Sequence, residues 1–330
     1  MIGMEEEETT AENYRRFARL EARGRSPLYE ELTEGVAGDP EVIELLHTLP
    51  RRLCQPNLLL GVVQLLFGTA EDYRVFRSYV TEHWAEVSAE MLVRRTQTNE
   101  PARCATLLPI LASLPQPLAL LEVGASAGLC LQPDRYAYDY GTGPEPIGPA
   151  DSSVVLCCAV TGPAPLPDAL PDIAWRLGVD IAPIDVRDPG ATRWLEALLW
   201  PGEGDRLARL RAALDLARPD PPRILRRDLT EGIADLVATA PSDATVVVFH
   251  TAVLAYVAPE PREAFVAEVQ ELPVTWLAQE GASVFPSLVA GVPEDELKAN
   301  EGSFVLSRDG EPLAFTDPHG AFMRWRENSG

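Results

Sequence analysis

Hydrophobic residues recur at helical spacing through the first third of the chain. Tyr14 and Phe17 lie three residues apart, on one face of a helix. Ser26-Pro27 and Asp39-Pro40 each join a helix-capping side chain to a proline, which is favoured at the first helical position. Residues 1–115 are therefore predicted to form an all-helical domain, which we expect to cover the carboxyl ends of a following sheet as a lid.

Strand-like runs begin at Leu118. Leu118–Val123 is a short apolar run between Pro117 and Gly124, as expected for a buried parallel strand. Further strand-like runs alternate with helical patterns: strands at 175–181, 223–225, 245–249 and 274–277, and helices at 191–199, 206–217, 233–238 and 262–272. This alternation predicts an α/β fold over residues 116–330, with a doubly wound parallel sheet covered on both faces.

Two segments depart from this alternation. Residues 132–170 contain three tyrosines and two proline-rich stretches around an apolar run, which predicts an inserted hairpin. Asp309-Gly310 separates two apolar runs near the C-terminus, and this turn predicts a β-hairpin at about 303–316.

The strongest chemical motif is the segment Glu122–Gly128. A predicted strand ends in Glu122, and a loop of small residues with Gly124, Ser126 and Gly128 follows and is expected to lead directly into a helix. Glycines allow the backbone to turn tightly and lie against a ligand, and a helix N-terminus adds unpaired amide donors. The alternative is a tight strand-to-helix turn with no ligand.

Acidic residues also end the next two predicted strands. Asp180 is placed to accept hydrogen bonds from the hydroxyls of a ribose, and Asp228 from an adenine amino group. The alternative for each is to cap a following helix. Three acidic strand tips in sequence order favour a nucleoside-binding sheet.

These motifs resemble those of the class I S-adenosylmethionine-dependent methyltransferases. The resemblance covers about residues 118–280 and implies a Rossmann-like methyltransferase-type fold with S-adenosylmethionine as cofactor. It implies that the cofactor contacts these residues: Glu122, Gly124, Ser126, Gly128, Asp180, Ile181, Asp228, Leu229 and Phe249. Two departures are clear. Ser126 replaces the usual middle glycine, and the interval from Gly128 to Asp180 is longer than one strand-helix-strand unit.

The whole chain is similar to an uncharacterised bacterial family, domain of unknown function 2332. Four segments carry this likeness: Gln97–Glu100, Glu122–Leu129, Val248–Tyr256 and Asp317–Gly320. The family brings no known activity.

Other polar residues are candidates for the site. His250 ends a strand, where open α/β sheets bind ligands, and is either a catalytic base or a buried structural histidine. Tyr256 is either a second catalytic residue at the substrate wall or part of the core. Gln97 and Asn99 belong to a polar junction that either caps a helix or closes over the cofactor, and we favour the cofactor. His319, in a Pro-His-Gly turn, is expected to be structural.

A rival interpretation uses the same loop. Gly124–Gly128 also reads G-x-S-x-G, the nucleophile elbow of α/β-hydrolases, with Asp228 and either His250 or His319 as partners of Ser126. No His-Gly-Gly oxyanion segment precedes the motif, the upstream region is helical, and the hydrolase mechanism has no use for Glu122. A serine esterase is therefore the second choice, beside a non-catalytic protein that binds a nucleoside or metabolite.

Composition narrows the choice of partners. Lys and Arg number 28 against 50 Asp and Glu, a net charge of −22, which disfavours nucleic acids and anionic membranes. Five cysteines without a C-x-x-C pair and an acidic start of the chain favour a reducing, cytoplasmic location. Four scattered histidines suggest no metal site. The sequence thus predicts a methyltransferase acting on a small molecule; no motif identifies the methyl acceptor or an oligomeric state.

Overall fold

The chain forms two compact units. The computed structural model describes residues 8–143, 145–284 and 286–327. The helical unit spans Met1–Thr98 and Asp188–Ala208, and the sheet unit spans Asn99–Arg187 and Arg209–Gly330. The expected boundary near residue 115 is therefore wrong: the helical unit ends at Thr98, and a later segment of the chain completes it.

The helical unit is built from short helices, most of which begin at a capping side chain. Ser26 Oγ accepts the amide of Tyr29, and Asp39 accepts those of Glu41 and Val42, so both predicted capping sites are confirmed. The helices are α1 (Thr10–Phe17), α2 (Pro27–Gly38), α3 (Pro40–Leu46), α4 (Pro56–Phe67), α5 (Tyr73–Glu82), α6 (Trp84–Val93) and α8 (Pro189–Ala197). Helix α8 joins them because Trp194 is buried in their core and its indole N–H donates to the Arg95 carbonyl at 2.9 Å.

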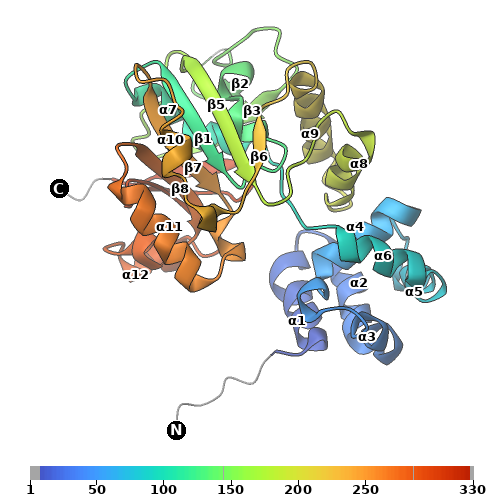
Figure 1. Ribbon diagram of the computed structural model, residues 1–330. Helices are drawn as coiled ribbons and strands as arrows, with labels where there is room; N and C mark the ends of the chain where they lie inside the picture. The colour runs from blue at the N-terminus through green and yellow to red at the C-terminus, as the bar shows by residue number, and fades with distance from the viewer. Residues whose placement is uncertain (1–7, 144, 285, 328–330) are drawn as a thin grey trace. The chain divides into compact units, whose positions relative to one another are not determined.

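The sheet unit contains a nine-stranded mixed sheet (Figure 1). Its order is β4-β11-β10-β9-β8-β7-β1-β5-β6. The strands are β1 (Leu118–Val123), β4 (Ala159–Thr161), β5 (Ile173–Asp180), β6 (Ile224–Arg226), β7 (Thr245–Thr251), β8 (Thr275–Gly281), β9 (Phe304–Arg308), β10 (Glu311–Thr316) and β11 (Phe322–Trp325). The five strands from β8 to β6 are parallel, while β9, β10 and β11 extend the sheet in antiparallel fashion.

Side-chain alternation gives the sheet two different faces. Leu121 and Val123 of β1 belong to the same buried cluster as Phe265 of α11 (Pro259–Glu271), so they face the layer that contains this helix. Glu122, between them, faces the opposite side. The remaining helices of this unit are α7 (Arg103–Ser113), α10 (Ala234–Val237) and α12 (Glu294–Ala299); α9 (Gly204–Ala217) begins in the helical unit.

The segment at 132–170 is not a hairpin. Its strands β2 (Ala137–Asp139) and β3 (Val155–Cys157) pair in parallel, and β4 leaves them to pair with β11 at the far edge of the main sheet. Parallel strands cannot be joined by a tight turn, so the proline-rich connection between them is a crossover. At the predicted C-terminal hairpin, β9 and β10 pair antiparallel around Asp309 and Gly310, both with positive φ.

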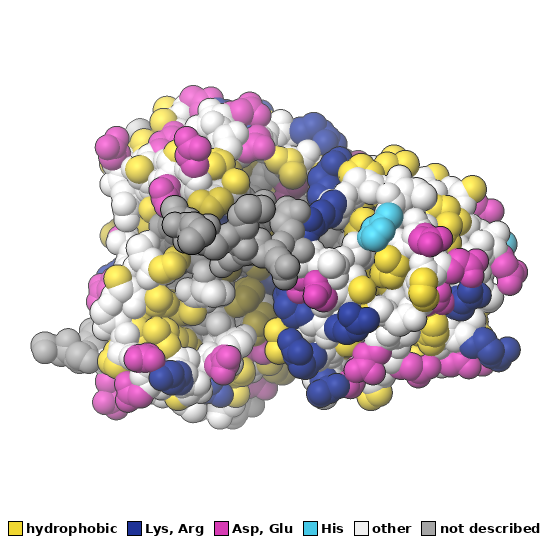
Figure 2. Space-filling model, turned by 90° about the horizontal axis from the view of Figure 1, so that it is seen from below, with side chains coloured by type: hydrophobic (Ala, Val, Ile, Leu, Met, Phe, Trp, Pro, Cys, Tyr) yellow, Lys and Arg dark blue, Asp and Glu magenta, His cyan; other side chains and the backbone are white. Residues whose placement is uncertain are grey.

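Acidic side chains are scattered over the face of the molecule that Figure 2 shows, among hydrophobic, basic and other side chains. Over the whole sequence they outnumber the basic ones, which gives the net charge of −22. Within the described ranges, no helix has both the length and the apolar character needed to cross a membrane.

Candidate functional site

The loop Gly124–Gly128, called the glycine loop below, lies at the carboxyl end of β1. The amides of Gly124 and Ala125 donate to the Val179 carbonyl at 2.8 and 3.0 Å, and that of Gly128 donates to the Ala125 carbonyl at 2.6 Å. Ser126 N donates to Asp180 Oδ2 at 2.8 Å, and Ala127 N to Asn99 Oδ1 at 2.9 Å. All five amides of the loop are therefore used inside the protein.

No α-helix follows the glycine loop. The chain enters a 3₁₀ turn at Leu129–Leu131 and leaves helical geometry at Gln132, where φ is −120° and ψ is 41°. Pro133 comes next, and proline lacks the N–H that would continue a helix. The prediction that the loop opens a helix is thus wrong, and the amide donors of a helix N-terminus are not part of this site.

Asp180 and Asn99 hold the glycine loop from two sides. Asp180 Oδ1 accepts the amide of Ala182 at 2.7 Å, while its Oδ2 accepts that of Ser126. Asn99 Nδ2 donates to Ser126 Oγ at 2.8 Å. The structure thus brings together three predicted site residues. A carboxylate has about four lone-pair sites, so Asp180 keeps the capacity to accept from a ligand.

Gly178 on β5 explains why the loop can lie so close to this strand. It pairs with Glu122, and a Cβ at this position would come within 2.7 Å of Ala125 Cβ. A glycine inside a strand marks such an approach of another backbone, and this signal was present in the sequence.

Glu122 is the most unusual group at this edge of the sheet. Its side chain is 4% exposed, and Oε2 has no hydrogen-bond partner among the described residues. Burial raises the pKa of this carboxyl well above its usual range; Cys130 and Asp180 act in the same direction, and Arg103 opposes them. An unpaired buried carboxyl group is costly, so Glu122 is a candidate for contact with a ligand.

Arg103, which sequence reasoning missed, supplies a buried cation on the same side of the sheet. Its Nη1 donates to the carbonyl and Oγ1 of Thr251 at 3.1 and 3.3 Å, and its Nε donates to the Pro318 carbonyl at 2.9 Å. Pro318 belongs to the turn that contains Gly320, where a Cβ would lie 2.2 Å from the Ala102 carbonyl oxygen. The sequence did contain a signal for Arg103, because it is a single charged residue at the start of an otherwise apolar helix.

His250 is fully buried and both of its ring nitrogens are engaged. Nδ1 lies 2.7 Å from Glu280 Oε1, and Nε2 accepts the indole N–H of Trp276 at 3.1 Å. Since Nε2 accepts, the ring proton is on Nδ1 and is donated to Glu280. His250 has no nitrogen left to take a proton from a substrate, so the geometry does not favour it as a base.

The other predicted residues lie at varied depths. Asp228 caps a 3₁₀ turn by accepting the amide of Thr230 at 2.9 Å. Capping is the structural role that was the alternative to a contact with adenine. Leu229 and Phe249 are buried, whereas Ile181 and Tyr256 are 59% and 70% exposed. Gln97 belongs to the helical unit, whereas Asn99 belongs to the sheet unit.

We expect Gly124→Ala to destabilise the sheet unit. At Gly124 φ is +72°, and a Cβ would lie 2.3 Å from Val253 Cγ2, so the change adds an overpacking cost of about 1–3 kcal/mol to the backbone strain. Gly141→Ala is the control, because φ is +68° and nothing lies within 4 Å. Thermal melting should show a clearly larger loss for Gly124→Ala; equal losses would contradict the contact with Val253.

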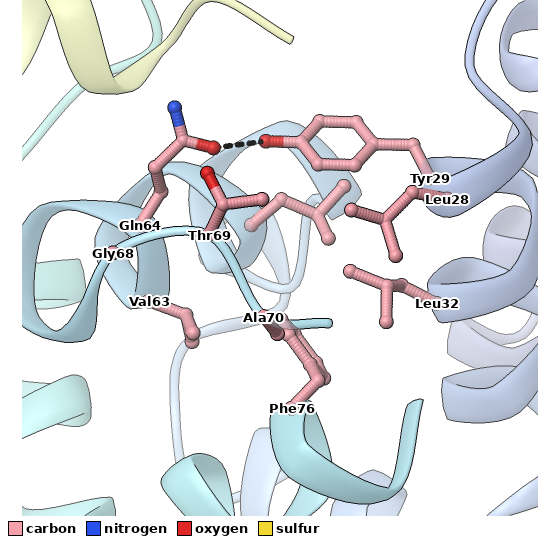
Figure 3. Close-up of a pocket in the computed structure, with 10 residues that line it drawn as sticks. Leu28, Tyr29, Leu32, Val63, Gln64, Gly68, Thr69, Ala70 and Phe76 are labelled. Atoms are coloured by element: carbon pink, nitrogen blue, oxygen red, sulfur yellow. Dashed lines mark hydrogen bonds between the residues drawn. The ribbon is translucent and has the colours of Figure 1, made fainter. Parts of the chain in front are cut away.

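The helical unit contains a small pocket between α2, α4 and α5 (Figure 3). Leucine, valine and phenylalanine side chains line it, and the Tyr29 hydroxyl donates to Gln64 Oε1 at 3.1 Å on one side. Its volume of about 10 Å³ has room for about one water molecule. It is too small for a cofactor. Within the described ranges, no three His, Cys, Asp or Glu side chains are grouped as metal ligands.

Fold and site together define an α/β protein with a candidate ligand site at the carboxyl ends of parallel strands. The chain matches, over residues 11–325, the family described as "Uncharacterized protein conserved in bacteria (DUF2332)". It belongs to this family. Comparison with curated proteins finds no match.

Proposed function

We propose that the sheet unit binds S-adenosylmethionine at the carboxyl ends of β1 and β5 and transfers its methyl group to a small molecule. The observation that carries this proposal is the buried Glu122 beside the glycine loop, whose Oε2 meets no hydrogen-bond partner in the part of the chain that the structure describes. Asp180, bonded to the same loop, is the second acidic group facing the ligand.

The strand order supports a nucleoside-type ligand. Taken in chain order, the five parallel strands β6-β5-β1-β7-β8 are third, second, first, fourth and fifth. This is the order of the doubly wound nucleotide-binding fold, in which ligands bind where the winding reverses, here between β1 and β7. Glu122 is the penultimate residue of β1 at that position and pairs with Phe249 of β7.

Local charge favours a cationic ligand over a phosphate. A dinucleotide needs free amide donors and a helix N-terminus at the loop after the first strand. Here the loop amides are all used, no α-helix follows, and Asp180 and Glu122 are both carboxyl groups; with its raised pKa, Glu122 would ionise on meeting a cation. S-adenosylmethionine has no phosphate and carries positive charge on its sulfonium and ammonium groups. NAD fits this edge less well.

The chain's own residues would bind and orient the reactants. The cofactor supplies an activated methyl group, and in such a transfer much of the barrier is overcome by alignment of the reacting atoms. His250, engaged on both nitrogens, does not serve as the base in this proposal. The acceptor best suited to the site is therefore a nucleophile that needs no proton removed by His250.

Calorimetric titration with S-adenosylmethionine, S-adenosylhomocysteine and NAD tests the proposal. We expect binding of the first two and no binding of NAD. Binding of NAD alone, or of none of the three, would overturn it. Binding without turnover on any acceptor would instead favour the non-catalytic alternative.

Ser126 separates this proposal from a serine hydrolase. Its φ of 50° resembles the strained backbone of a nucleophile elbow, but its hydroxyl is bonded to Asn99 and not to a histidine. We expect no labelling of the protein by a fluorophosphonate probe. Ser126→Ala should change S-adenosylhomocysteine affinity by less than about tenfold, the value of one neutral hydrogen bond. Stoichiometric labelling at Ser126 would reverse the ranking.

A further inference from the structure

The loop that follows β7, Ala252–Tyr256, is anchored by one buried carboxylate. Glu280 Oε1, on β8, accepts the amides of Val253 and Leu254 at 2.8 and 3.1 Å and faces His250 Nδ1 at 2.7 Å. Glu280 is 1% exposed, and its Oε2 has no partner among the described residues. One oxygen therefore receives three donors, an arrangement that fixes both the histidine and the loop.

His250 completes the anchor because Trp276 fixes its ring. The indole N–H of Trp276 donates to His250 Nε2 at 3.1 Å, which leaves the ring proton on Nδ1 and directed at Glu280. Phe265 lies edge-on to the imidazole with ring centroids 5.7 Å apart. The imidazole therefore has a single orientation, set from β8 and α11.

The anchored loop lies directly against the glycine loop. Ala252 adopts a positive φ of 57°, and its amide donates to the Gln279 carbonyl at 2.9 Å. This bend turns Val253 towards Gly124, so closely that a Cβ on Gly124 would overlap its methyl groups. Val253, whose amide donates to Glu280, is therefore the residue of this loop that packs against Gly124.

We propose that Glu280 and His250 are positioning residues that hold the loop after β7 against the glycine loop and so set the affinity of the ligand site. The inference rests on the proposed function for the identity of that ligand. It assigns the buried histidine a role that needs no proton transfer to substrate: His250 and Glu280 fix the backbone that contacts the glycine loop from the β7 side.

Glu280→Gln tests this role, with Gln279→Met as the matched control. Gln279 is the neighbouring residue of the same strand and is also fully buried, and it bonds Thr106 and Thr316 on the opposite face. Both changes should lower the melting temperature. We expect only Glu280→Gln to weaken S-adenosylhomocysteine binding, by roughly tenfold, the effect of losing about one charge-assisted hydrogen bond.

A double-mutant cycle with Val253→Ala distinguishes positioning from general destabilisation. If Glu280 acts through Val253, the two losses of affinity should not add. The double variant should then bind S-adenosylhomocysteine no more weakly than whichever single variant has the lower affinity. Multiplicative losses, or equal affinity changes in Glu280→Gln and Gln279→Met, would overturn the proposal.

Hydrogen exchange keeps the test independent of the ligand's identity. In the ligand-free protein, Glu280→Gln should accelerate exchange of the Ser126 and Ala127 amides as well as those of Val253 and Leu254, whereas Gln279→Met should not. If the wild type binds no S-adenosylhomocysteine, the proposed function fails, and exchange at the glycine loop alone decides the positioning role. Unchanged exchange at Ser126 and Ala127 would refute it.

Discussion

Glu122→Gln is expected to stabilise the protein at neutral pH and to weaken its binding of S-adenosylhomocysteine. Glu122 is buried, its Oε2 has no partner within the described segments, and burial raises its pKa, so ionisation in the folded protein is costly. Glutamine keeps the shape without the titratable proton. The melting temperature should rise by roughly 2–4 °C for each kcal/mol gained.

The stabilisation should depend on pH in a defined direction. The pKa of Glu122 is higher in the folded protein than in the unfolded chain, where a glutamate titrates near ~4.3. Between these two values the folded protein holds a proton that the unfolded chain has lost, so stability falls as pH rises. Glutamine does not titrate. The advantage of Glu122→Gln in melting temperature should therefore grow as the pH rises above the pKa of the unfolded chain, until the pKa of the folded state is passed.

The loss of affinity should be specific for the cationic part of the ligand. S-adenosylhomocysteine carries an ammonium group, whereas methylthioadenosine has the same nucleoside without it. Losing one charge-assisted contact should weaken the first by roughly tenfold or more and leave the second unchanged. Equal effects on both ligands would contradict a cation contact at Glu122.

Glu100→Gln is the matched control for stability. Glu100 is as buried as Glu122, but it pairs with Arg209 at 2.8 Å and accepts the Ala102 amide at 3.1 Å. Removing its charge breaks a paired network, so the melting temperature should fall. A rise in Glu100→Gln, or a fall in Glu122→Gln, would show that the missing partner of Glu122 does not determine its effect.

Sequence patterns located the strands around the site well. Leu118–Val123 was predicted with the bounds that β1 has, because a strand buried on both faces is a continuous apolar run that ends where the chain turns. Asp180 ends β5 for the same reason, since the last residue of such a strand is the first able to meet solvent. These two elements carry most of the candidate site.

The partners of the buried polar groups could not be predicted. Arg103 meets the backbone of Pro318 and Thr251, far away in sequence, and Glu280 meets His250 across neighbouring strands. Such pairings follow from sheet order and side-chain direction, which the hydrophobic pattern does not specify. The helix expected after the glycine loop failed for a local reason, the proline that follows Gln132.

Asp180→Ala is expected to weaken S-adenosylhomocysteine binding by roughly ten- to a hundredfold. Two charge-assisted hydrogen bonds from ribose hydroxyls would be lost, each worth roughly 1.5–3 kcal/mol before water fills the gap. The structure adds a second loss, because Asp180 also accepts the Ser126 and Ala182 amides. Melting temperature and affinity should therefore fall together, and titration and thermal melting of the same variant measure both.

Asp188→Ala separates the two contributions to this loss. Asp188 accepts the amide of Gly190, two residues ahead, at 2.8 Å, just as Asp180 accepts that of Ala182, but it lies in the helical unit. Its removal should cost about 1 kcal/mol of stability, the typical value of such a cap, and leave affinity unchanged. If Asp180→Ala behaves like Asp188→Ala, with lower stability and full affinity, Asp180 is a structural turn residue and the ribose contact is refuted.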